Sequence, residues 1–246
     1  MISAINSGLS GLTVHTAMVS TAAGNLANLN TTGYKSSQAD LGTRGAASQA
    51  GGEVGQGAQV LSTSRNFSTG ALVSTGNELD LAIQGNGFFK VRQGGQDVYT
   101  RDGSFHLDQD RYLVDAQGNR LQPDLQLPQD TASIRVDPNG HLTALDAGGN
   151  TVASADIPLA TFTNANGLQA IGNNDFVPTA ASGPPLDAAA GAGGAGTLTQ
   201  GALEGSNVDP APEMVNLIIG QQGFTASIKV LQTSAAMLGS LLDIRA

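Results

Sequence analysis

Apolar and small residues near the N-terminus recur at alternating steps of three and four, which is the spacing of a heptad seam along one face of an α-helix. The seam ends shortly before Gly33, a residue suited to the left-handed position after a helix C-terminus. This pattern predicts an N-terminal helix over residues 1–33. Gly8, Gly11 and Gly24 each weaken an isolated helix by up to about 1 kcal/mol relative to Ala, so we expect it to need a packing partner. The seam consists of Ile2, Ile5, Leu9, Leu12, Thr16, Val19, Ala23 and Leu26.

A second seam with the same spacing lies at the other end of the chain and predicts a C-terminal helix within residues 207–246. Asp209 is a good N-cap acceptor, and Pro210 suits the first helical position, where a backbone donor has no partner. Because no other segment carries a comparable seam, we expect the two terminal helices to pair as a coiled coil or to join those of neighbouring copies. The second seam consists of Met214, Leu217, Gln221, Phe224, Ile228, Leu231, Ala235, Leu238 and Leu242.

The pattern changes between the two seams. Residues 77–179 contain short apolar runs separated by Gly and Asn turns, which predict a central antiparallel β domain. Residues 34–76 are rich in Gly, Ser, Thr, Ala and Gln and are expected to form an extended link. Residues 180–206 include a stretch of Gly, Ala and Pro that predicts a flexible return linker. The predicted fold class is therefore α+β and mainly β, with terminal helices around one β domain.

Charge and composition exclude several classes of function. The net charge is −9 and no run of Lys or Arg occurs, so nucleic acid is not an expected partner. The absence of cysteine excludes disulfides, thiolate metal sites and cysteine nucleophiles. The chain contains no run of about 18 apolar residues, the length needed to span a membrane. The N-terminus lacks the basic and apolar regions of a cleaved signal peptide. Aromatic residues make up only 4% of the chain, so we expect stability to depend on packing and assembly.

Residues that could carry chemistry form no convincing site. The chain has three histidines, His15, His106 and His141. They are far apart and match no metal-binding spacing. Acidic residues between positions 102 and 115 lack the pattern of a calcium loop and are more typical of turns than of a glycosidase carboxylate pair. The turn at 85–87 precedes a strand rather than a helix, and Ser104 lies outside a GxSxG motif. We therefore expect no catalytic residue, no cofactor and no metal.

Longer motifs flank the predicted helices. The segment Asn25–Lys35 resembles the N-terminal signature of the flagellar axial family, which includes rod, hook and hook-associated proteins. Leu203–Asp209 and Glu213–Ile218 are similar to its C-terminal signature, and Asp80–Phe89 and Tyr99–Phe105 resemble the β-domain core of its hook and distal rod branch. The candidate functional residues within the terminal motifs are Asn25, Asn28, Thr32, Gly33, Tyr34, Lys35, Ser206, Asn207, Val208 and Glu213.

The resemblance implies a non-enzymatic structural subunit of the bacterial flagellar basal-body rod, most like a distal rod protein. It implies self-assembly into a helical tube that transmits torque and forms part of the export channel wall. The expected partners are further copies of the chain, other rod and hook proteins, and the export apparatus. The expected location is the basal body, across the periplasm, after type III export without a cleaved signal peptide. The two seams, together with Asn25 and Asn28 near the end of the first helix, are expected to make the assembly contacts.

Departures from the family pattern leave alternatives open. Gln222 and Ser227 stand where the family usually has Arg and Asn, and the link after Lys35 is short for a distal rod protein. A flagellar hook subunit is therefore the second interpretation. A proximal rod protein is less favoured, because that branch tends to lack the pattern at Gly87–Phe89. A carbohydrate-binding β protein, suggested only by the acidic turns, is the alternative from a different class.

Overall fold

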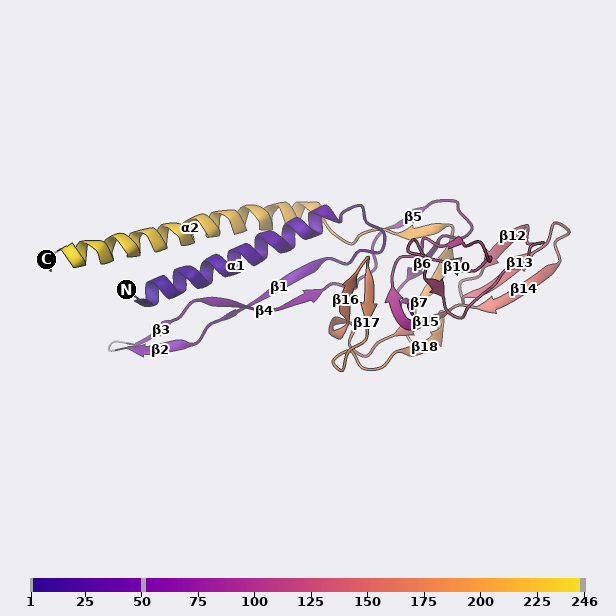
Figure 1. Ribbon diagram of the computed structural model, residues 1–246, viewed down its shortest axis with the longest axis horizontal. Helices are drawn as coiled ribbons and strands as arrows, with labels where there is room; N and C mark the ends of the chain where they lie inside the picture. The colour runs from indigo at the N-terminus through magenta and orange to yellow at the C-terminus, as the bar shows by residue number, and fades with distance from the viewer. Residues whose placement is uncertain (1, 50–51, 244–246) are drawn as a thin grey trace. The chain divides into compact units, whose positions relative to one another are not determined.

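The computed structural model describes residues 2–49 and 52–243, and the chain divides into two compact units. The helical unit comprises Met1–Asn28, Ser37–Arg65 and Val208–Ala246, and the β unit comprises Leu29–Ser36 and Asn66–Asn207. One helix lies at each end of the sequence, with antiparallel strands between them (Figure 1). This arrangement confirms the predicted class, α+β and mainly β.

The helical unit combines two helices and a long hairpin. Helices α1 (Ile2–Ala27) and α2 (Pro210–Asp243) lie side by side and run antiparallel (Figure 1). Strands β1 (Ser37–Thr43) and β4 (Ala58–Arg65) pair antiparallel and contact α1. The hairpin continues into the pair formed by β2 (Ala46–Gln49) and β3 (Gly52–Gly55).

Local chemistry sets the helix ends. Asp209 Oδ1 accepts a hydrogen bond from Ala211 N at 3.0 Å, so the start of α2 is capped as the sequence predicts. After α1, Asn28 N donates to Asn25 O at 3.1 Å and to Gly24 O at 3.3 Å, and the chain then leaves the helix. Over the residues described, neither helix has the length and hydropathy that crossing a membrane requires.

Small residues bring α1 and α2 close together. A Cβ added at Gly11 would lie 2.9 Å from Ser227 Oγ, and one added at Gly220 would lie 2.7 Å from Val19 Cγ2. Glycine at these positions costs helix stability in isolation but allows the two backbones to approach. The closer contact gains dispersion energy along the whole pair. The two helices therefore pack closely at these glycines, and the dependence of α1 on its partner for stability stays a prediction.

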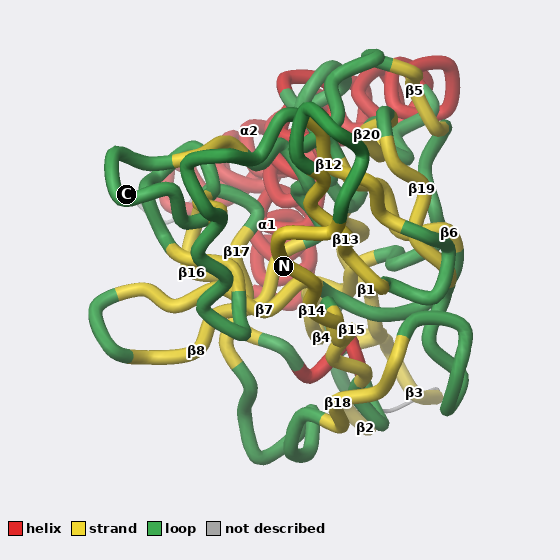
Figure 2. Tube along the Cα trace, turned by 90° about the vertical axis from the view of Figure 1, so that its right-hand side faces the viewer, coloured by secondary structure: helices red, strands yellow, loops and turns green. Residues whose placement is uncertain are grey.

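The β unit contains a seven-stranded antiparallel sheet, a three-stranded sheet and three strand pairs, joined by turns and loops (Figure 2). The order in the larger sheet is β16-β17-β8-β7-β11-β10-β9 and in the smaller β12-β13-β14, and the pairs are β15-β18, β19-β6 and β20-β5. The strands are β5 (Leu72–Ser74), β6 (Leu81–Gln84), β7 (Phe89–Gln93), β8 (Gln96–Thr100), β9 (His106–Leu107), β10 (Leu113–Val114), β11 (Arg120–Leu121), β12 (Ser133–Val136), β13 (His141–Leu145), β14 (Thr151–Asp156), β15 (Pro158–Thr161), β16 (Gln169–Gly172), β17 (Asp175–Val177), β18 (Leu186–Ala189), β19 (Thr197–Gln200) and β20 (Ala202–Glu204).

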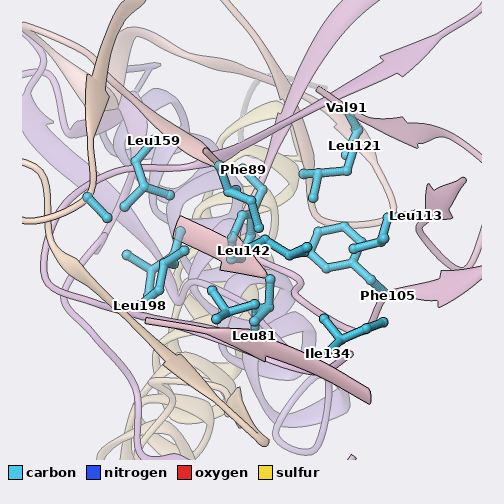
Figure 3. Close-up of a cluster of buried hydrophobic side chains, with 14 of the residues drawn as sticks. Leu81, Phe89, Val91, Phe105, Leu113, Leu121, Ile134, Leu142, Leu159 and Leu198 are labelled. Carbon is cyan, nitrogen blue, oxygen red and sulfur yellow. The ribbon is translucent and has the colours of Figure 1, made fainter. Parts of the chain in front are cut away.

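Two apolar clusters form the core of the β unit. The larger one gathers branched aliphatic side chains around the edge-to-face pair of Phe89 and Phe105, whose ring centroids are 5.2 Å apart (Figure 3). The smaller one is aromatic, with edge-to-face ring contacts at 5.0–5.8 Å. Its rings are Phe67, Phe88, Tyr99, Phe162 and Phe176. The few aromatic residues of the chain are thus concentrated where each ring contact adds about 0.5–1.5 kcal/mol.

Two predicted segments differ from the structure. The predicted extended link, residues 34–76, is divided, because residues 37–65 form the hairpin of the helical unit. The predicted flexible linker, residues 180–206, contains β18, β19 and β20, each paired with an earlier strand. Its glycines make turns, and Gly191 and Gly194 have φ values of 76° and 83°. Composition identifies such turn residues but not the distant strands that satisfy the backbone hydrogen bonds between them.

Candidate functional site

An exposed apolar patch covers the first turns of α2. Met214, Val215, Ile218 and Ile219 are each between 50% and 58% exposed. Residues four apart lie on the same side of a helix, so the pairs Met214–Ile218 and Val215–Ile219 form two adjacent rows, together here called the α2 patch. Large apolar side chains gathered in one exposed strip are typical of a protein interaction site.

The predicted seam residues occupy several environments. Half-buried members are Ile5, Leu12, Val19, Leu26, Leu217, Phe224, Ile228, Leu231 and Leu238. Leu9 is 55% exposed, and Met214 belongs to the α2 patch. The side chains of Ile2 and Leu242 lie outside the described residues. The part that these residues play in assembly stays a prediction.

The sequence did not predict one buried face of α1. Val14 and Ala22 are buried, although neither belongs to the predicted seam. Both share a face with Ser10, whose hydroxyl accepts a hydrogen bond from Ala58 N of the hairpin at 3.3 Å. The heptad pattern assigned α1 a single partner, whereas α1 contacts both α2 and the hairpin.

Asn25 connects three elements of the helical unit. Its Nδ2 donates to Ser37 O at 2.8 Å, and Ser37 N donates to its Oδ1 at 2.9 Å. The same Nδ2 donates to Glu213 Oε1 at 2.8 Å. Asn25 is fully buried, so these bonds hold α1, β1 and α2 in one register. Asn28 Nδ2 instead donates to Gly24 O of its own helix at 2.9 Å.

The remaining terminal motif residues lie mainly on two short segments of the β unit. We name residues 29–36 the N-terminal connector and residues 204–207 the C-terminal connector. Gly33 N donates to Glu204 O at 2.7 Å, and Ser36 N donates to Asn207 Oδ1 at 2.8 Å. Asn207 Nδ2 donates further to Asn66 O at 2.7 Å. Of the other motif residues, Thr32, Tyr34 and Ser206 are half-buried in the β unit, and Val208 is buried in the helical unit.

Three buried charged side chains, here called the charge cluster, lie where the connectors meet. Lys35 Nζ is 2.6 Å from Glu204 Oε1, and Arg101 Nη1 is 3.3 Å from Glu204 Oε2. All three side chains are at most 1% exposed. Lys35 Nζ also donates to Ser68 O at 2.7 Å, and Gly70 N donates to Glu204 Oε1 at 2.8 Å. Two cations therefore share one carboxylate in a site that is shielded from bulk solvent.

Burial governs the protonation of this cluster. It lowers the pKa of Lys35 below the ordinary value, while the bond to Glu204 acts in the opposite direction. Burial likewise lowers the pKa of Arg101, again opposed by Glu204. Arg101 Cζ lies 5.1 Å from the ring centroid of Phe88, a cation–π contact. Arg101 Nε has no hydrogen-bond partner among the described residues, and Glu204 is the carboxylate that contacts both cations.

Most of each connector and of each helix lies within segments shared with known proteins. The model of the flagellar hook protein FlgE/F/G D1 domain matches residues 82–144, that of the flagellar basal body rod FlgEFG protein C-terminal matches 199–244, and that of the flagella basal body rod protein matches 5–35. The basal-body rod protein FlgG of Borreliella burgdorferi is 36% identical over 97% of this chain and 97% of its own length. The chain belongs to the flagellar rod and hook protein family.

Further relatives support the same assignment. The basal-body rod protein FlgG of Bacillus subtilis is 34% identical over the full length of both chains. The flagellar hook protein FlgE of Helicobacter pylori is 40% identical over 116 residues, which are 47% of this chain and 16% of that protein. The resemblance inferred from the motifs is confirmed.

Two members of the charge cluster were not among the candidates drawn from the family motifs. Glu204 lies inside the C-terminal motif and Arg101 inside the segment Tyr99–Phe105, but neither was chosen as a functional residue. Glu204 stands between Leu203 and Gly205, and a charged residue among apolar or small neighbours is a usable signal for a buried ion pair. Arg101 stands between Thr100 and Asp102 and gives no such signal. What the sequence does not show is that the two segments meet with Lys35.

The acidic residues considered as a possible site act in turns. Asp108 Oδ1 accepts from Tyr112 N at 2.8 Å, and Asp115 Oδ1 accepts from Asn119 N at 2.8 Å. Both carboxylates therefore hold the backbone of their own loops. Within residues 2–49 and 52–243, no three His, Cys, Asp or Glu side chains are grouped as a metal site requires.

Asp175, in the β unit, has a buried carboxyl group whose ionisation is unfavourable. Burial, with the negative charges of Asp115 and Asp102, raises its pKa to about 6. The folded state then binds the proton more tightly than the unfolded chain. The resulting stabilisation is complete below about pH 3.8 and is lost as the pH rises through about 6. Asp175→Asn is therefore expected to raise the free energy of unfolding at pH 8 by about 1–3 kcal/mol.

Urea unfolding between pH 4 and pH 8, followed by tyrosine fluorescence, measures this effect. The Asn variant should lose the part of the pH dependence that wild type shows around pH 6. Asp130→Asn is the matched control, because Asp130 is exposed and should leave the profile unchanged. An Asp175→Asn protein less stable than wild type at pH 8 would contradict the prediction.

Proposed function

We propose that the chain is a structural subunit of the flagellar basal-body rod and polymerises through its terminal helices. The α2 patch carries this proposal, because four half-exposed apolar side chains on one helix are suited to burial against a neighbouring copy. Such burial contributes about 25 cal/mol per Å². A head-to-tail contact repeated between identical copies propagates a helical tube, with the predicted seams adding to the buried surface.

A rod subunit is favoured over a hook subunit by the extent of the similarity. The relatives that match over their full length are named basal-body rod proteins, whereas the hook protein matches over 16% of its length. The proposal includes a tube that transmits torque, lines the export channel and crosses the periplasm within the basal body. Its partners are further rod proteins, the hook and the export apparatus, and it includes neither enzymatic activity nor a cleaved signal peptide.

A charge placed on the α2 patch tests the proposal. Ile218→Asp should leave the fold intact, because Ile218 is 56% exposed, but it should abolish polymerisation and motility. The measurement is sedimentation of the purified chain under conditions where wild type polymerises, together with swimming of cells that carry only the variant. Normal assembly of the Ile218→Asp chain would overturn the proposal.

The neighbouring residue Asn216 provides the control. It is exposed on the same turn of α2 but lies outside the patch. Asn216→Asp adds the same charge, and the amount of polymer that it forms should be at least about half of the wild-type amount. Electron microscopy of the wild-type polymer then separates the two family alternatives, since a straight tube supports the rod and a curved one supports the hook.

A further inference from the structure

The charge cluster joins residues that are far apart in sequence. Lys35 and Glu204 are separated by 169 positions, yet their side chains form a fully buried pair. We infer that Lys35, Glu204 and Arg101 act as an electrostatic clasp, which lets the N-terminal connector dock on the β unit only when the C-terminal connector is in place. Glu204 is the residue on which the clasp depends.

The reason is the number of groups that Glu204 stabilises. Its carboxylate contacts two buried cations and the amide of Gly70, and its backbone carbonyl accepts from Gly33. Without this carboxylate, Lys35 and Arg101 would be two like charges in a buried site shielded from bulk solvent. Removing one partner of a buried ion pair is far more costly than replacing the whole pair, because the remaining charge stays uncompensated. The charged Lys35 side chain is therefore unstable in its buried position until the Glu204 carboxylate lies beside it.

Close backbone contacts restrict the position in which the clasp can close. A Cβ added at Gly33 would lie 2.7 Å from Arg101 C, and one added at Gly70 would overlap the carbonyl of Gly205. The connectors thus fit against the β unit only in one position. Asn207 adds hydrogen bonds to both neighbouring segments, which hold the closed state once the charges have met.

The clasp gives the two terminal motifs a shared role in positioning. The N-terminal connector follows the end of α1 and the C-terminal connector precedes the start of α2, so a closed clasp holds both connectors within the β unit. A chain whose last residues are missing or misfolded would leave its N-terminal connector undocked. The consequence for assembly rests on the function proposed above, whereas the clasp itself can be tested on the unassembled full-length chain.

Amide hydrogen exchange of Gly33 and Gly70 by NMR tests the inference. Glu204→Gln keeps both acceptors of these amides, so faster exchange reports opening of the clasp rather than loss of a partner atom. We expect the exchange of both amides to rise by about a hundredfold or more. Asp187→Asn is the matched control, because it removes a carboxylate from the more exposed pair with Lys90 and should change the exchange by less than about threefold.

The double variant distinguishes electrostatics from packing. In the Glu204→Gln background, Lys35→Met removes one of the two uncompensated cations and keeps most of the side-chain volume, so exchange should slow by about tenfold or more relative to Glu204→Gln alone. A steric role predicts the opposite, a further acceleration. The inference is overturned by faster exchange in the double variant, or by Gly33 and Gly70 amides in Glu204→Gln that stay within about threefold of wild type. If Glu204→Gln alone does not fold, a folded double variant supports the clasp and an unfolded one refutes it.

Discussion

Gly103→Ala is expected to destabilise the β unit strongly, because the added methyl group has no space in the core. A Cβ at Gly103 would overlap the backbone carbonyl of Leu81 and would lie 3.1 Å from the ring of Phe89. The carbonyl cannot move away, because Leu81 N donates to Gly103 O at 3.0 Å and holds the two segments together. A backbone overlap in a packed core belongs to the rare class of substitutions that cost about 4 kcal/mol or more.

Tyrosine fluorescence during thermal unfolding measures this effect, since Tyr34, Tyr99 and Tyr112 all lie in the β unit and the chain has no tryptophan. The midpoint should fall by about 10 °C. Gly148→Ala is the control in the same unit, because Gly148 is exposed, its φ is not positive and an added Cβ would meet only the side chains of Asp146 and Asn150, at 3.2 Å. A Gly103→Ala midpoint within about 2 °C of wild type would show that the Leu81 segment can shift.

Local patterns in the sequence predicted the elements that depend on local chemistry. The seams predicted both terminal helices, and Asp209 and Pro210 marked the start of α2 correctly. Short apolar runs predicted the antiparallel β domain, because strand patterns and turns are also local. The motifs then identified the family, which the full-length relatives confirm.

Features that depend on distant contacts were not predictable in the same way. The strand β19, within the predicted flexible linker, pairs with β6 more than a hundred residues earlier, and nothing in its short sequence encodes that partner. Val14 is buried because α1 has a second neighbour, which a one-partner seam does not reveal. The charge cluster is the same case for the candidate site, since Lys35, Arg101 and Glu204 come together only through the fold.

The glycines show how one residue type has several uses. Gly11 was expected to weaken its helix and Gly220 was given no role, yet both determine how closely the helices pack. Gly33 was expected only to end a helix. In the structure α1 already ends at Ala27, and Gly33 instead fills a space too small for a side chain, next to the backbone of Arg101, where its N donates to Glu204 O. Sequence identified its conformation but not this contact.

Gly33→Asn should therefore destabilise the β unit by about 3 kcal/mol, even though Asn tolerates a left-handed backbone. Gly33 has a φ of 68°, which Asn adopts at modest cost. Its Cβ would however lie 2.7 Å from both Arg101 C and Asp102 N, and backbone atoms on that strand end cannot yield as a flexible side chain does. The measurement is urea unfolding followed by tyrosine fluorescence.

Gly118→Asn is the control that distinguishes the cost of the backbone conformation from the cost of a steric overlap. Gly118 has a φ of 83°, but an added Cβ meets nothing within 4 Å, so its replacement should cost less than about 1 kcal/mol. If the two variants lose the same small amount of stability, backbone conformation alone explains the glycine at position 33. If Gly33→Asn loses several times more, the close contact with Arg101 is the reason, and the N-terminal connector is held on the β unit by shape as well as by charge.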